Sequence, residues 1–153
     1  MRGMHLAQLN IATPVAPPGS PELEGFMSRL EEINALADRS PGFVWRLVGD
    51  DGDDATGLRP YGPDVMVNLS VWESLESLRE FTYRTGHLEL MRSRRQWFKA
   101  ADGPYLAMWW VPAGHIPSVV EAGERLEHLR VHGPTPEAFT FRAPFPRPGT
   151  LAA

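Results

Sequence analysis

The chain has 153 residues, 42% of them hydrophobic, and carries a formal net charge of -4 at neutral pH. This length and apolar content suit one domain with a single core. The acidic balance argues against nucleic acid as a partner, because binding to phosphates requires a basic surface. The chain contains no cysteine, which excludes disulfides, thiol nucleophiles and thiolate metal sites.

The sequence has no segment that would direct it to a membrane. Its N-terminus lacks the apolar core of a signal peptide, and no later stretch approaches the run of about 18 apolar residues that a membrane span requires. We therefore expect a cytoplasmic protein with no membrane partner.

Hydrophobic periodicity divides the chain into strands and helices. Alternating side chains predict strands, and apolar residues three or four positions apart predict amphipathic helices. Clusters of proline and glycine separate the periodic segments, which is typical of turns within a fold. In chain order, these patterns predict a strand over 5–12, a helix over about 22–38, strands over 43–48 and 65–72, a helical segment over 74–99 interrupted at Thr85-Gly86, a strand over 105–111, and a final helix that Ser118 opens and Gly133 closes.

Two segments could be interpreted as metal sites. The acidic loop at 49–54 lacks the alternating carboxylates and final glutamate of an EF-hand, so we interpret it as a solvated hairpin loop. His128 and His132 lie one helical turn apart, but cationic side chains at a solvated helix C-terminus explain them. We predict no metal.

The order of the predicted elements indicates a split βαβ arrangement. In that arrangement both helices cover one face of a four-stranded antiparallel sheet. We therefore predict an α+β fold, a ferredoxin-like plait over residues 1–133, followed by an extended proline-rich C-terminal arm over 134–153 that packs on the body or on a partner.

The two faces of the predicted sheet differ in chemistry. Val65, Val67, Leu69 and Val71 alternate on one face of the third strand, which we expect the helices to cover. An open second face carrying polar and aromatic side chains indicates a ligand or partner surface, and two such faces packed together would enclose a small-molecule cavity in a homodimer. The side chains expected on the open face are Gln8, Asn10, Met66, Asn68, Ser70, Trp72 and a tryptophan of the fourth strand.

Several segments in a fixed order resemble one bacterial family. They are HLAQLNIA at 5–12, PGFVWRL at 41–47, NLSVWES at 68–74, YRTGH at 83–87, RRQWF at 94–98 and LAMWWVPAGH at 106–115. Through these segments the chain resembles the DUF3291 family over roughly residues 5–142. The resemblance implies a dimeric α+β barrel, whose other branches resemble antibiotic-biosynthesis monooxygenases, small cyclases and haem enzymes, and it implies no assigned reaction.

Tyr83 and His87 form the sharpest candidate catalytic pair, because a spacing of four places them on one helix face. Histidine can transfer protons near neutral pH, and tyrosine can polarise a developing oxyanion or orient the imidazole. Asn68 is the third catalytic candidate, as a polarising group. The alternative for the pair is structural, with His87 capping or bridging the helix while Tyr83 packs.

The predicted ligand-binding residues comprise polar side chains of the open face, large apolar side chains and one arginine. Buried amides require partners, which a bound ligand or trapped water would provide. The alternative for the amides is a polar network across a dimer interface, and for most tryptophans it is core packing. The predicted residues are Gln8, Asn10, Trp45, Met66, Ser70, Trp72, Arg94, Trp97 and Trp109.

Three functions fit this prediction. We favour a cofactor-independent enzyme of monooxygenase, cyclase or isomerase type that acts on an aromatic or polycyclic metabolite. The second hypothesis places a haem in the cavity, with His87 as axial ligand and Arg94 pairing with a propionate. The third is a non-catalytic ligand-binding or structural dimer.

Overall fold

The computed structural model describes residues 3–17, 19–49, 58–84 and 91–148, and these contain a four-stranded antiparallel sheet. The strands lie in the order β2-β3-β1-β4, with β1 and β3 in the centre. Their bounds are Met4–Ala12 for β1, Phe43–Arg46 for β2, Met66–Trp72 for β3 and Leu106–Pro112 for β4. The predicted ferredoxin-like α+β fold is confirmed.

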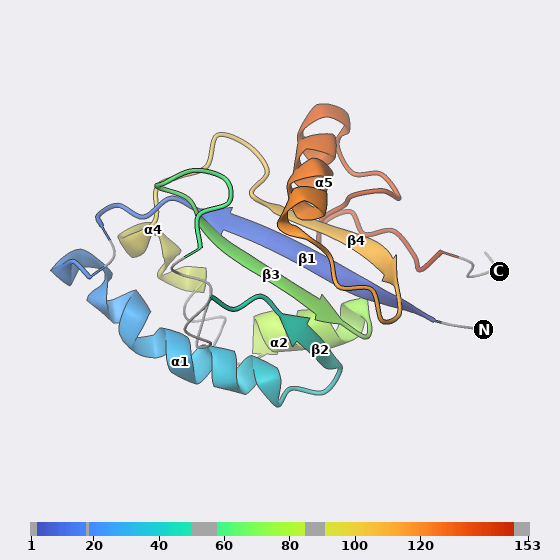
Figure 1. Ribbon diagram of the computed structural model, residues 1–153, viewed down its shortest axis with the longest axis horizontal. Coiled ribbons are helices and arrows are strands. Elements are labelled where there is room, and N and C mark those ends of the chain that lie inside the picture. The colour runs from blue at the N-terminus through green and yellow to red at the C-terminus, as the bar shows by residue number, and fades with distance from the viewer. Residues whose placement is uncertain (1–2, 18, 50–57, 85–90, 149–153) are drawn as a thin grey trace.

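Helices lie on both sides of the sheet (Figure 1). The short 3-10 turn η1 leads into α1, and α1 and α2 lie on one side, while α5 lies on the other. The short α4 follows α2 in the described chain and packs near η1. The bounds are Pro21–Leu23 for η1, Glu24–Asp38 for α1, Leu75–Arg84 for α2, Arg94–Trp97 for α4 and Val119–His132 for α5.

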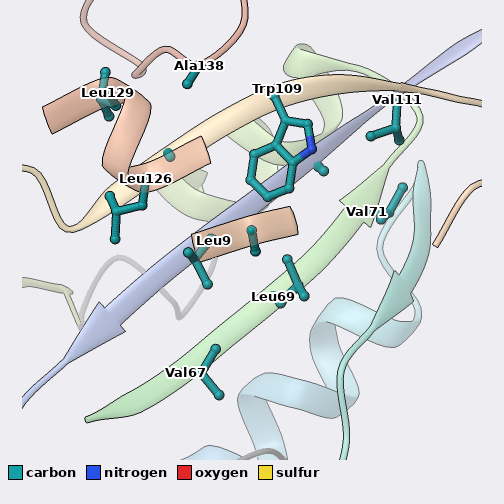
Figure 2. Packing of buried hydrophobic residues seen from close by; sticks show 12 residues of the cluster. Leu9, Val67, Leu69, Val71, Trp109, Val111, Leu126, Leu129 and Ala138 are labelled. Atoms are coloured by element: carbon teal, nitrogen blue, oxygen red, sulfur yellow. The ribbon is translucent and has the colours of Figure 1, made fainter. Parts of the chain in front are cut away.

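The prediction of which face the plait helices cover is wrong. The face that carries Val67, Leu69 and Val71 packs against Leu126 and Leu129 of α5. Alternation separates the two faces of a strand but does not say which of them α1 and α2 cover. Figure 2 shows this α5 layer, in which Leu9, Val67, Leu69, Val71, Trp109 and Val111 from the strands meet Leu126 and Leu129.

The opposite face lies beneath α1 and α2, and we call it the polar face because it carries Gln8, Asn10, Asn68 and Ser70 in paired register. Gln8 is directly opposite Ser70, and Asn10 is opposite Asn68. Because α5 covers the other face, the prediction of an open sheet face is wrong, and the argument for a homodimer that rested on it no longer holds.

The described part of the predicted C-terminal arm packs on the body of the same chain. Phe139 is fully buried and exchanges two backbone hydrogen bonds of 2.9 Å with Met108 of β4. The Trp110 indole donates to the Phe145 carbonyl at 3.0 Å, and Arg147 donates to the Glu73 carbonyl at 3.0 Å. These contacts make residues 134–148 part of the structural body.

Polar side chains anchor the start of α5. Ser118 accepts a hydrogen bond from the Glu121 backbone N–H, which agrees with the prediction that Ser118 opens this helix. The Glu121 carboxylate accepts from the Trp109 indole at 2.9 Å and contacts His115 Nε2 at 2.7 Å. Burial raises the pKa of Glu121, but the hydrogen bonds from His115 and Trp109, with the charges of His115 and Arg125, outweigh it, so the pKa is lowered.

The lowered pKa of Glu121 predicts a pH-dependent contribution to stability. A carboxyl whose pKa is lower in the folded state stabilises the fold above its unfolded pKa, and this contribution is lost as the pH falls through the folded value. We expect Glu121→Gln to lower the free energy of unfolding by about 1–2 kcal/mol at neutral pH, measured by urea denaturation, and the gap to close at acidic pH. Glu124→Gln, an exposed change on the same helix, should have little effect. A gap that persists unchanged at low pH contradicts the assignment.

Candidate functional site

A cavity of about 220 Å³ lies between the polar face and the layer formed by α1 and α2. We call it the sheet–helix cavity. Residues of a single chain line it, whereas the sequence predicted a cavity between two copies. Its described lining contains no aspartate or glutamate, and its cationic side chains are Arg46 and Arg94. The structure brings together in this lining the predicted residues Gln8, Asn10, Met66, Asn68, Ser70, Trp72 and Arg94.

A hydrogen-bonded network forms the floor of the cavity. The buried Gln8 amide donates from Nε2 to Asn68 Oδ1 at 2.6 Å and to Ser70 Oγ at 2.8 Å. Asn10 Nδ2 donates to Gln8 Oε1 at 3.3 Å and to Asn68 Oδ1 at 3.4 Å. The Trp72 indole, which can only donate, bonds to Ser70 Oγ at 3.0 Å. The network therefore lies within one chain.

This network leaves the Asn68 amide nitrogen available. Asn68 Oδ1 accepts from both Gln8 and Asn10, which uses its two lone pairs. Asn68 Nδ2 has no hydrogen-bond acceptor among the described residues, and the Asn68 side chain is exposed although it lies on a central strand. Two N–H donors are thus held on the cavity floor in a fixed orientation.

Aromatic rings surround the buried end of the cavity. Trp72 stacks on Phe81 of α2, with ring centroids 5.2 Å apart, and meets the edge of Phe43 at 5.4 Å. Phe141 from the C-terminal segment and Phe26 from α1 also line the cavity. The wall therefore suits a flat apolar body, with the polar groups concentrated on the sheet side.

The two arginines of the lining differ in their partners. Arg46 forms an ion pair with Asp38, with 2.8 Å between Nε and Oδ1. Arg94 is half-buried, and its guanidinium lies over the rings of Tyr105 at 4.2 Å and Phe98 at 5.3 Å. Within the described chain no carboxylate or other hydrogen-bond acceptor contacts Arg94.

Several predicted site residues lie elsewhere. Trp45 and Trp109 pack in the α5 layer, where Trp109 donates to Glu121. Trp97 is buried beside Phe26 but is not part of the cavity lining. Tyr83 is 40% exposed and packs edge-on against Phe141, also outside the described lining. His87 lies outside the described residues.

Sequence reasoning missed the residues that roof the cavity. Phe26, Leu30, Ile33 and Asn34 belong to the sheet-facing stripe of α1, and the same periodicity that predicted the helix marks this stripe. Once the polar face lies beneath α1, these side chains meet it. Phe141 carries no comparable signal, because it sits in an irregular segment.

Two absences concern metal ions and membranes. Within the described ranges no group of three histidine, aspartate or glutamate side chains is placed to hold a metal ion. In that same part of the chain no helix is long and apolar enough to cross a membrane.

These features define a small α+β protein with a ligand-sized cavity between its sheet and helices. The chain belongs to the family described as Domain of unknown function (DUF3291), whose model matches residues 5–153. The resemblance inferred from the sequence is thereby confirmed. A comparison with curated proteins found no match.

Solved structures with a similar arrangement come from several bacteria. A protein of unknown function from Nitrosomonas europaea shares 12% identity, with a TM-score of 0.48, 77% of this chain and 99% of that chain covered. A putative antibiotic biosynthesis monooxygenase from the same organism shares 14% identity at a TM-score of 0.44, with coverage of 76% and 93%. SnoaB, a cofactor-independent oxygenase from Streptomyces nogalater, shares 21% identity at a TM-score of 0.45, with coverage of 74% and 98%.

Proposed function

We propose that this protein binds an oxygen-bearing aromatic or fused-ring metabolite in the sheet–helix cavity and acts on it as a cofactor-independent enzyme. The observation that carries the proposal is the Asn68 amide, which lines an aromatic-walled cavity and whose two N–H donors have no protein acceptor in the described chain. A carbonyl or phenol oxygen of a ligand would accept from them.

The cavity volume limits the size of the ligand. An apolar cavity of about 150 Å³ takes one benzene ring, so the 220 Å³ found here suits one or two fused rings. A porphyrin has four pyrrole rings and exceeds this volume. The proposed reaction therefore does not use haem.

The chemistry proposed for Asn68 is stabilisation of negative charge on the ligand oxygen. Isomerisation or cyclisation of a ketone, and oxygenation of a phenol, each begin when a proton leaves and charge develops on oxygen. Donors already oriented toward that oxygen lower the barrier without reorganising. His87 remains our candidate for the proton-transferring group, and mutation of His87 would test it independently of the Asn68 role.

The compound 1-tetralone, a fused aromatic ketone with exchangeable hydrogens beside its carbonyl, provides the test. We expect it to bind about tenfold more tightly than tetralin, which lacks the oxygen, in a calorimetric titration. We also expect the protein to accelerate deuterium incorporation beside the carbonyl in D₂O, followed by NMR. Binding without accelerated exchange would contradict the enzymatic part and favour a binding protein. Equal affinity for tetralin would contradict the role of Asn68, and a Soret band in the purified protein would restore the haem hypothesis.

A further inference from the structure

Arg94 separates two cavities. It lines the sheet–helix cavity and also a second cavity of about 580 Å³, whose wall includes Lys99, Tyr105 and Arg130. Ala12 and Tyr105 also belong to both linings, so the Arg94 side chain lies at the boundary between the two cavities.

Aromatic rings hold the Arg94 guanidinium in place. Its stacking on Tyr105 and Phe98, at 4.2 Å and 5.3 Å from the ring centroids, restricts the planar group without using its N–H donors. No acceptor within the described ranges contacts these donors. Arg94 is thus a preoriented cation whose N–H donors are available to a ligand.

The charge around Arg94 is the reverse of that of the whole chain. The second cavity is lined by Arg94, Lys99 and Arg130, with Asp102 as its one acidic side chain among the described residues. The sheet–helix cavity has no acid in its described lining, although the chain carries a net charge of -4. This local positive potential favours an anionic ligand group.

We infer that the natural ligand is an aromatic carboxylate whose ring fills the sheet–helix cavity and whose carboxylate pairs with Arg94. The inference rests on the proposed function and adds the charge class of the ligand. A single planar guanidinium matches a carboxylate in two parallel hydrogen bonds. Arg94 is on this inference a specificity-determining residue that binds the carboxylate, whereas Asn68 binds the other ligand oxygen.

The test compares 2-naphthoate with 2-naphthamide, which has the same shape and no charge. We expect the wild-type protein to bind 2-naphthoate about tenfold more tightly, with the preference reduced when salt is raised to about 0.5 M. Arg94→Gln should abolish the preference, measured as the ratio of the two affinities in the same variant, while Arg94→Lys should retain part of it. Arg95→Gln makes the same change in net charge at an exposed neighbour outside both linings and should leave the preference intact.

The outcomes separate this inference from the proposed function. If 1-tetralone and 2-naphthamide bind but 2-naphthoate gains nothing, or if Arg95→Gln removes the preference as fully as Arg94→Gln does, the assignment of Arg94 is overturned alone. If neither neutral ring compound binds, the proposed function falls and this inference falls with it. Thermal unfolding of each variant identifies any loss of binding that comes from misfolding. If Arg94→Gln misfolds, the preference retained by Arg94→Lys, which keeps the side-chain stem and charge, tests the inference in its place.

Discussion

Gly42→Ala is expected to destabilise the fold by about 2–5 kcal/mol. Gly42 has a φ of +83°, a conformation that costs an L-residue about 1–2 kcal/mol. An added Cβ would also overlap Ser77 Cβ and lie 2.6 Å from Ser77 Oγ. Overpacking of this kind adds about 1–3 kcal/mol. Urea denaturation measures the change.

Ser77 has little freedom to relieve this contact. Its backbone N–H donates to Ser74 Oγ at 3.0 Å, and its hydroxyl donates to the Ser74 carbonyl at 2.9 Å. Gly114 provides a matched control, because its φ is +92° and nothing lies within 4 Å of the Cβ position. We expect Gly114→Ala to cost only the backbone strain, about 1–2 kcal/mol. Equal losses for the two variants would show that the Ser77 contact has no energetic weight.

Much of the fold follows from periodicity alone. The alternation of β1 and β3 correctly placed Gln8 and Ser70 on the same face as Asn68, and the paired register confirms it. The choice of covering helix was wrong for a physical reason. The alternation of side chains is the same whichever face of the sheet a helix covers. Because α5 lies outside the split βαβ pattern, no local feature of the sequence predicts that it packs on the face that carries Val67, Leu69 and Val71.

Strand geometry explains why Trp45 and Trp109 lie away from the cavity. The pairing of β2 with β3 shifts register between Phe43 and Trp45, so these two side chains, two residues apart, face opposite sides of the sheet. The residue pattern of a four-residue strand is too short to reveal such a bulge. In β4, Trp109 and Trp110 are adjacent, and only the pairing of Gln8 with Met108 shows that Trp110 belongs to the polar face.

The cavity itself could be predicted only in part. Its floor belongs to two strands whose side-chain directions are fixed by a period of two, whereas its roof depends on the packing of α1, α2 and the C-terminal segment. Phe81 and Phe141 reach Trp72 and the cavity through tertiary contacts that no spacing in the chain encodes. Alternation therefore located the polar groups, while the enclosing wall required the folded structure.

Asn68→Asp is expected to weaken 1-tetralone binding by about tenfold to a hundredfold. The substituted carboxylate has the same shape and can still accept from Gln8 and Asn10, so the network beneath it is retained. The two N–H donors, however, are replaced by an anionic oxygen that repels the ligand oxygen. Calorimetric titration of the variant, with thermal unfolding to verify the fold, measures the loss.

Asn34→Asp separates the donor role of Asn68 from an effect of added charge. Asn34 lines the same cavity from α1 and is half-buried, so the variant introduces the same charge without touching the network, and we expect less than about a threefold loss of affinity. A second readout follows from titration. As the pH falls toward the pKa of the introduced carboxyl, normally about 3.9, protonation supplies one O–H donor, and binding to Asn68→Asp should partly recover while wild-type binding does not rise. Equal losses for the two variants, with no recovery in acid, would mean that Asn68 contributes only space and not a donor.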